Sequence, residues 1–125
     1  MTQSNDTQET KQFYADVNRN VLVNLPISGT QLKLRPATSR DLDAIAVVVS
    51  EGLDGKPVTG MRGMIFHAAR LLTPVKELRE NEDAWKSRYE QLNGYDFDAE
   101  DLEVLLEALM SFRSTNFIRS TSVPG

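Results

Sequence analysis

The stretch Gln31–Ile45, QLKLRPATSRDLDAI, decides the fold because its hydrophobic pattern changes from that of a strand to that of a helix. Its first four residues alternate between polar and apolar, which is the period of a strand. Pro36 then ends the strand, Thr38 is a favourable N-cap, and Asp41 stands three residues later, as a capping box requires. The stretch therefore predicts a strand followed directly by a helix that begins at Ser39.

The residues just upstream predict a partner for this strand. The segment Val21–Leu25 also alternates, and Ser28 and Gly29 lie between the two alternating segments. Gly29 can adopt the positive φ that tight hairpin turns demand, and Pro26 cannot donate a ladder hydrogen bond, which favours a place next to the turn. We therefore expect an antiparallel β-hairpin.

Four amphipathic helices are expected after the hairpin. Gly52 ends the first, Thr73 and Pro74 separate the second from the third, and Asp98 caps the fourth. The residues expected on their apolar faces are Leu42, Ile45, Ala46 and Val49 in the first, Met61, Met64, Ile65, Ala68, Leu71 and Leu72 in the second, Leu78, Trp85, Tyr89 and Leu92 in the third, and Leu102, Leu105, Leu106, Leu109 and Met110 in the fourth.

The predicted fold class is mainly α with a small N-terminal β-hairpin, an α+β arrangement in a single domain. A chain of 125 residues has room for one modest core. We assign residues 13–113 to this domain, residues 1–12 to a disordered polar arm and residues 114–125 to a flexible tail. On the third helix, Glu82 and Lys86 stand four residues apart and are expected to form an ion pair.

Composition excludes several classes of function. The chain has 14 Lys and Arg against 18 Asp and Glu, a net charge of −4, which disfavours nucleic acid as a partner. It has no cysteine and one histidine, so thiolate chemistry and multi-histidine metal sites are excluded, and no cofactor is indicated. No signal peptide or membrane-spanning run is visible, so we expect a cytoplasmic protein without membrane contact.

Three features could suggest chemistry, but each has a simpler interpretation. His67 is interpreted as a surface or boundary residue of the second helix, because no motif supplies a nucleophile or an orienting group. The loop GLDGKPVTGMRG is interpreted as a flexible loop, because Pro57 follows Lys56 and the order of a phosphate loop is not met. The acidic residues Asp96, Asp98, Glu100 and Glu107 lack the glycine of a calcium loop and are interpreted as capping a helix.

The methionine-rich second helix and the leucine-rich fourth helix are candidates for contact with a partner. Methionine tolerates varied contacts, and a groove between amphipathic helices can accept another helix. The residues predicted to bind a partner are Met61, Met64, Ile65, Leu105, Leu109 and Met110.

The segment that contains the strand-to-helix junction resembles the N-terminal part of the tail assembly chaperones of tailed bacteriophages. Members of that family often begin with a short strand pair, a glycine turn, a junction with the pattern LR-P-T-D-L, and then helices. The loop DGKPVTG has no counterpart in this resemblance. The matching positions are Leu25, Pro26, Gly29, Leu32, Leu34, Arg35, Pro36, Thr38, Asp41 and Leu42.

The resemblance implies a non-enzymatic chaperone in the cytoplasm of an infected bacterium. Such a protein coats the tape measure protein, keeps its long helices dispersed and helps recruit tail tube subunits. A small structural component of the tail or baseplate, retained in the virion, is the alternative, and an enzyme that uses His67 is the weakest hypothesis. Self-association and a longer frameshifted form are left open by the sequence.

Overall fold

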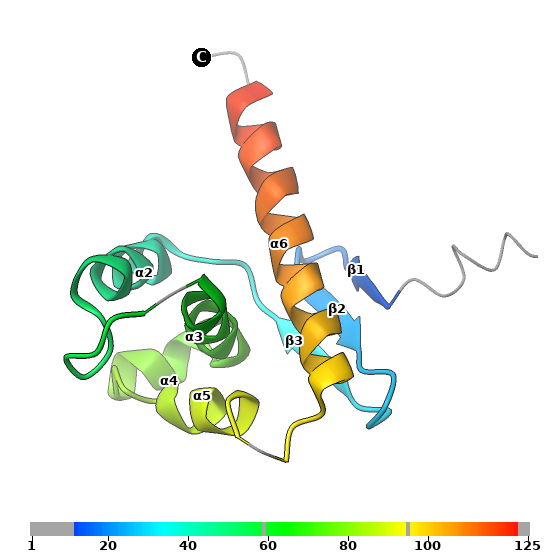
Figure 1. Cartoon of the computed structure of the whole chain (residues 1–125). Helices are drawn as coiled ribbons and strands as arrows, with labels where there is room; N and C mark the ends of the chain where they lie inside the picture. Colours follow the sequence, from blue (N-terminus) through cyan, green and yellow to red (C-terminus); the bar gives the residue numbers. More distant parts are fainter. Residues whose placement is uncertain (1–11, 59, 95, 123–125) are drawn as a thin grey trace, which may run out of the picture.

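The computed structural model describes residues 12–58, 60–94 and 96–122, with side chains as far as Ser111. Within these residues a three-stranded antiparallel sheet precedes five helices, which confirms the predicted α+β class (Figure 1). The elements are β1 (Phe13–Ala15), β2 (Val21–Asn24), β3 (Gln31–Leu34), α2 (Ser39–Glu51), α3 (Gly60–Leu72), α4 (Val75–Glu80), α5 (Lys86–Leu92) and α6 (Ala99–Ser122).

The predicted hairpin is formed by β2 and β3, with Val21 opposite Leu34 and Val23 opposite Leu32. Gly29 in the connecting turn has a φ of 77°, as expected from its position. The sequence did not predict β1, which is only three residues long and pairs with β2 to make the third strand. The buried face of the sheet is therefore built by the alternation that predicted the hairpin.

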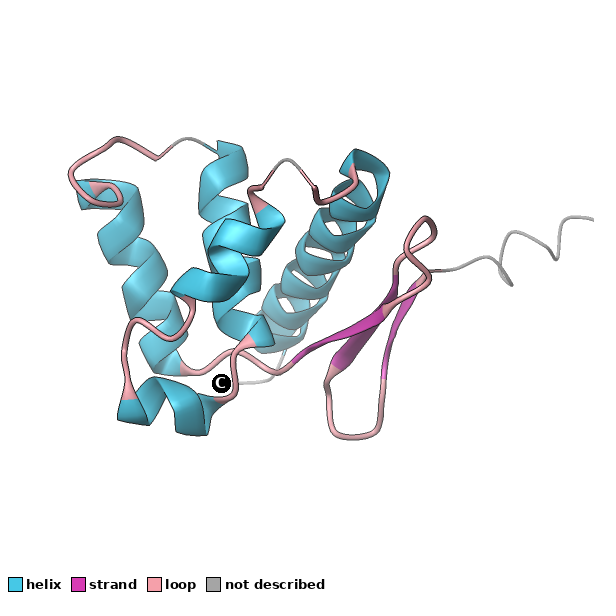
Figure 2. Ribbon diagram, turned by 90° about the horizontal axis from the view of Figure 1, so that it is seen from below, coloured by secondary structure: helices cyan, strands magenta, loops and turns pink. Residues whose placement is uncertain are grey.

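Helix α3 is the central element of the fold and packs against α2, α5, α6 and β3. Its residues 65–71 are all buried, so it is covered on every side rather than along one stripe. His67 is one of these buried residues, with 2% of its surface exposed, and its predicted place at the surface is wrong. Figure 2 shows the sheet at one end of the helix cluster.

Helix α2 begins and ends where the sequence predicted, but it turns a different face to the core. Asp41 and Val48 are buried, whereas Leu42 and Val49 are 55% and 67% exposed. The ion pairs of Asp41 account for this rotation, because its side chain must point inward to reach Arg35 and Arg70. Of the predicted apolar stripe, Leu42, Ala46 and Val49 therefore lie at the surface, and only Ile45 packs against the core.

The single third helix predicted from residue 74 onward is two helices, α4 and α5. Asn81 ends α4 in an extended conformation, and its side chain accepts a hydrogen bond from the backbone N–H of Asp83, which starts a turn. The expected pair between Glu82 and Lys86 is replaced, since Glu82 binds two arginines and Lys86 lies 3.9 Å from Asp83.

Helix α6 runs between the sheet and the other helices and contacts β2 and α3 (Figure 1). Asp98 caps it as predicted, accepting hydrogen bonds from the backbone N–H groups of Glu100 and Asp101. Asp101 in turn accepts hydrogen bonds from the backbone N–H groups of Ile27 and Ser28 at 2.8 and 3.1 Å. One buried carboxylate thus fastens the hairpin turn to the start of α6.

The two predicted terminal segments differ in how much of them the structure describes. The N-terminal arm falls on residues 1–11, outside the described residues, apart from residue 12. The backbone of α6 is helical through Ser122, so it includes most of the segment 114–125. The flexibility of that segment stays a prediction.

Replacing Asp101 with Asn should destabilise the fold more than replacing the neighbouring Glu100 with Asn, which removes the same charge. The amide keeps one acceptor oxygen for two backbone donors, so we expect Asp101→Asn to lower the free energy of unfolding by about 2 kcal/mol. Exposed Glu100→Asn in the same helical turn is the control and should change it by less than about 0.5 kcal/mol. Urea unfolding of both variants measures the difference, and equal losses would contradict the role assigned to Asp101.

Candidate functional site

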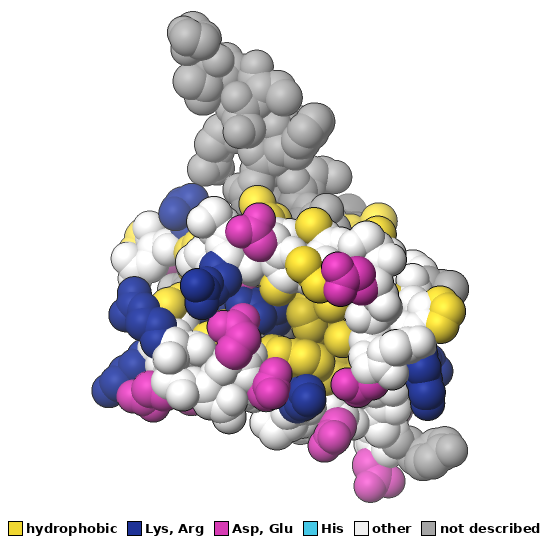
Figure 3. All heavy atoms as spheres, turned by 90° about the vertical axis from the view of Figure 1, so that its left-hand side faces the viewer, with side chains coloured by type: hydrophobic (Ala, Val, Ile, Leu, Met, Phe, Trp, Pro, Cys, Tyr) yellow, Lys and Arg dark blue, Asp and Glu magenta, His cyan; other side chains and the backbone are white. Residues whose placement is uncertain are grey.

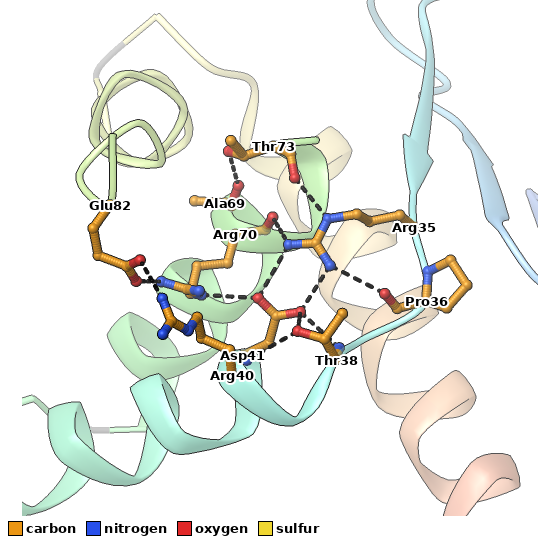
Figure 4. Close-up of polar contacts among 9 residues, drawn as sticks. All are labelled: Arg35, Pro36, Thr38, Arg40, Asp41, Ala69, Arg70, Thr73 and Glu82. Atoms are coloured by element: carbon orange, nitrogen blue, oxygen red, sulfur yellow. Dashed lines mark hydrogen bonds and ion pairs between the residues drawn. The ribbon is translucent and has the colours of Figure 1, made fainter. Parts of the chain in front are cut away.

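The main polar feature of the fold is a cluster of Arg35, Thr38, Asp41, Arg70 and Glu82, which we call the Asp41 cluster (Figure 4). It joins the end of β3, the start of α2, the end of α3 and the segment between α4 and α5. These are the places where the chain changes direction around the central helix. The strand-to-helix junction supplies three of its five members.

Arg35 is the donor at the centre of the cluster. Its guanidinium group forms a bidentate pair with Asp41, at 2.7 and 3.0 Å. Its remaining N–H groups donate to the backbone carbonyls of Pro36, Arg70 and Thr73 at 3.1, 2.9 and 2.6 Å. A guanidinium group has five N–H donors, so Arg35 has none left over.

Asp41 is fully buried and accepts from three residues. Besides Arg35, it accepts from the Arg70 Nε at 3.0 Å and from the backbone N–H and hydroxyl of Thr38 at 2.8 and 3.0 Å. Burial alone would raise the pKa of the Asp41 carboxyl group. The hydrogen bonds and charge of Arg35, together with hydrogen bonds from Thr38 and Arg70, outweigh burial and hold this pKa well below its usual range.

Arg70 extends the cluster toward the surface. Its side chain is 2% exposed and donates through Nη1 to Glu82 at 3.0 Å, while the Glu82 side chain is 52% exposed. Glu82 also lies 3.5 Å from the largely exposed Arg40, a contact worth little in free energy. With Glu82 included, two arginines face two carboxylates, so the buried positive charges are balanced.

The cluster also closes the C-terminal end of α3, whose last carbonyl groups have no partners within the helix. The guanidinium group of Arg35 binds the carbonyl of Arg70, and the Arg35 backbone N–H binds that of Leu71 at 3.0 Å. The Thr73 hydroxyl binds the carbonyl of Ala69 at 2.8 Å. A positive charge at this end is also favoured by the helix dipole.

Chemically, the Asp41 cluster is a structural site. Arg35 has used every donor, and the Asp41 carboxylate is saturated by five hydrogen bonds, so neither group is available to a substrate. The capping box of Thr38 and Asp41, predicted from the sequence, is present. The ion pairs of Asp41 with Arg35 and Arg70 were not predicted, because nothing in the spacing of residues 35 and 70 shows that they meet.

The residues predicted to bind a partner do not form one surface. Ile65, Leu105 and Leu109 are core residues with at most 2% of their surface exposed, since α3 and α6 pack against each other. Met64 is partly buried, whereas Met61 and Met110 are 61% and 57% exposed. The buried three are therefore not available to a partner in this structure, and binding by the methionines stays a prediction.

The loop after α2 contains an ordered turn. Leu53 and Lys56 exchange two backbone hydrogen bonds of 2.9 Å, and the residues between them, Asp54 and Gly55, both have positive φ, as in type I′ turns. Gly52 precedes it with a φ of 83°, and a Cβ there would meet the Lys56 carbonyl oxygen. The predicted loop is present from 52 to 58, with a defined turn from 53 to 56, whereas residues 60–63 of the predicted segment begin α3. Its flexibility stays a prediction.

The four acidic residues interpreted as capping a helix are all exposed, and one of them has a structural role. Asp98 caps α6, whereas the side chains of Asp96, Glu100 and Glu107 are not part of this cap. Among the described residues no group of three or more His, Asp or Glu side chains could hold a metal ion. None of the described helices is long and apolar enough to cross a membrane.

Hydrophobic side chains gather on the face of the molecule that carries α2 and the loop after it. Figure 3 shows them at the centre of this face, with acidic and basic side chains around them. The exposed apolar residues of α2 are Leu42, Val47 and Val49, and Met61 is exposed at the start of α3.

Comparison of the chain with protein-family models, with curated proteins and with solved structures gives no match in any of the three.

The Asp41 cluster predicts that two aspartates of α2, Asp41 and Asp43, contribute very differently to the free energy of unfolding. Replacing Asp41 with Asn breaks a buried ion pair and should lower the free energy of unfolding by about 3 kcal/mol. Exposed Asp43→Asn carries the same charge change and should cost less than about 0.5 kcal/mol. Urea unfolding of the two variants tests this, and a small effect at both positions would show that the cluster does not hold the fold together.

The lowered pKa of Asp41 also predicts how stability depends on pH. Because this carboxyl group holds its proton more weakly in the folded chain, its contribution is complete above the unfolded-state pKa of about 4 and is lost as the pH falls below that value. Urea unfolding between about pH 6 and pH 2.5 should show this loss. The Asp41→Asn variant should show a shallower decline, and an unchanged slope would argue against Asp41 as its source.

Proposed function

We propose that this protein is a non-enzymatic assembly chaperone of bacteriophage tails that binds the tape measure protein and helps recruit tail tube subunits. The resemblance that motivates the proposal lies in the strand-to-helix junction. Three of its matching positions, Arg35, Thr38 and Asp41, belong to the Asp41 cluster. These three matching residues therefore act together in one structural cluster, which supports a fold similar to that of the tail assembly chaperones. The step from a similar fold to the same function is an analogy.

The observation that carries the functional proposal is the exposed apolar side of α2. Leu42, Ala46 and Val49 stand at spacings of four and three residues, so they lie along one side of the helix, and all three are exposed. An apolar stripe of this kind on a small acidic protein suits reversible packing against another amphipathic helix. Coverage of such a helix by a chain of net charge −4 would also keep the complex dispersed.

The proposed contact differs from the one expected from the sequence. We assign it to Leu42 and Val49 of α2, together with Met61 at the start of α3, because these side chains are more than half exposed. Their substitution should leave the core intact, so a loss of binding can be separated from a loss of folding.

Charge placed on the α2 stripe should abolish binding of the tape measure protein. The chain, or its Leu42→Asp/Val49→Asp variant, is co-expressed with the tape measure and tail tube proteins of the same phage, and complexes are recovered by pull-down. We expect the unchanged chain to keep the tape measure protein in the supernatant and the double variant to lose it, because an aspartate in an apolar contact is desolvated without a partner.

The control is Ser87→Asp, which adds a negative charge at an exposed position of α5 and should bind normally. Circular dichroism checks that every variant is folded. Undiminished binding by a folded double variant would show that the contact does not lie on α2. Recovery of this protein from purified virions in a fixed ratio would favour the alternative, a structural component of the tail or baseplate.

A further inference from the structure

A pocket of about 230 Å³ opens between the loop after α2, the start of α3 and α5. It lies apart from the Asp41 cluster, and none of the five residues of that cluster lines it. Sites for cofactors and other small molecules usually measure about 300 to 1,000 Å³. The smaller volume suits one or two side chains of a protein partner.

One wall of the pocket is formed by apolar side chains that are held in place. Trp85 and Tyr89 line it from α5 and its N-terminal flank, and Val58 lines it from the loop. Trp85 packs edge to face against the core residue Phe66, with ring centroids 4.7 Å apart, and against Tyr89, with centroids 5.8 Å apart. A wall that is already fixed loses little conformational entropy when a ligand binds.

The opposite wall is also preformed. The turn from Leu53 to Lys56, closed by two backbone hydrogen bonds, contributes both of these residues to the lining. Because the two central residues of the turn have positive φ, it matches the type I′ turns that are tight and well defined. The pocket is therefore bounded by ordered backbone on one side and by packed aromatic rings on the other.

The charges around the pocket favour an acidic ligand. Three basic residues line it, Lys56, Arg62 and Lys86, against two acidic residues, Asp54 and Glu90. This local excess of positive charge stands on a chain whose net charge is −4. A carboxylate that approaches the rim therefore meets more cations than anions.

Two of the three cations are available. Among the described residues neither Lys56 nor Arg62 forms an ion pair, whereas Lys86 pairs with Asp83 at 3.9 Å. Lys86 also lies 5.9 Å from the centroid of the Trp85 ring, at the edge of the apolar wall.

We propose that this pocket binds an apolar side chain, best an aromatic one, that a protein partner presents between acidic residues. The aromatic walls would take the side chain, and Lys56, Arg62 and Lys86 would pair with the flanking carboxylates. The proposal rests on the pocket alone and stands whether or not the chain is a tail chaperone. It assigns a role to residues 53–58 of the loop after α2, most of which the family resemblance does not explain.

Trp85 is the one tryptophan of the chain, so its fluorescence reports directly on the pocket. The probe is an acetylated and amidated pentapeptide with a central phenylalanine between two acidic residues on each side. Two matched peptides have a central alanine or have lysines in place of the acidic residues. We expect a saturable change in Trp85 emission with the first peptide and at least fivefold weaker responses with the other two.

Charge reversal on the protein completes the test. The double variant Lys56→Glu/Arg62→Glu should bind the acidic peptide about fivefold more weakly, as the loss of two exposed ion pairs implies. The control Lys76→Glu, on exposed α4 and outside the pocket, should bind as the unchanged chain does. No saturable response at millimolar peptide, equal responses to acidic and basic peptides, or an unaffected double variant would each overturn the proposal.

Discussion

The fold depends on one buried carboxylate, that of Asp41, which binds two arginines at the same time. Asp41 caps its own helix and binds Arg35 and Arg70, which ties the sheet, α2 and α3 to a common point. Desolvating three charges is costly, and the cost is met only because every donor and acceptor is satisfied and Glu82 balances the second arginine. The rotation of α2 follows from this demand: Asp41 points inward, and the apolar stripe that includes Leu42 points outward.

The same constraint links the fold to the surface that a partner would use. A helix rotated by its hydrophobic residues alone would bury Leu42 and Val49, whereas the capping box and the ion pairs leave them exposed. The loop after α2 then starts from Gly52 and forms the wall of the pocket beside Trp85. The proposed helix contact and the proposed peptide pocket thus both follow from the placement of one helix.

Local signals predicted the parts of the fold that local interactions determine. The hairpin turn at Gly29, the capping box at Thr38 and the cap at Asp98 could be read from the sequence because each is formed within a few residues. Contacts between distant segments could not be read in this way. Asp101 binds backbone groups more than seventy residues away, and Arg70 meets Asp41 from another helix, so neither pairing leaves a periodic pattern.

The candidate site shows the same limit. A stripe of apolar residues does not reveal which of them are buried in the core, and Ile65 and Leu105 were therefore predicted to contact a partner although they are buried.

The most direct measurement is a double-mutant cycle of unfolding free energies with Arg35→Gln and Asp41→Asn. If Asp41 holds the junction through Arg35, the two losses should be coupled by at least about 1.5 kcal/mol. Losses that add to within about 0.5 kcal/mol would contradict the account.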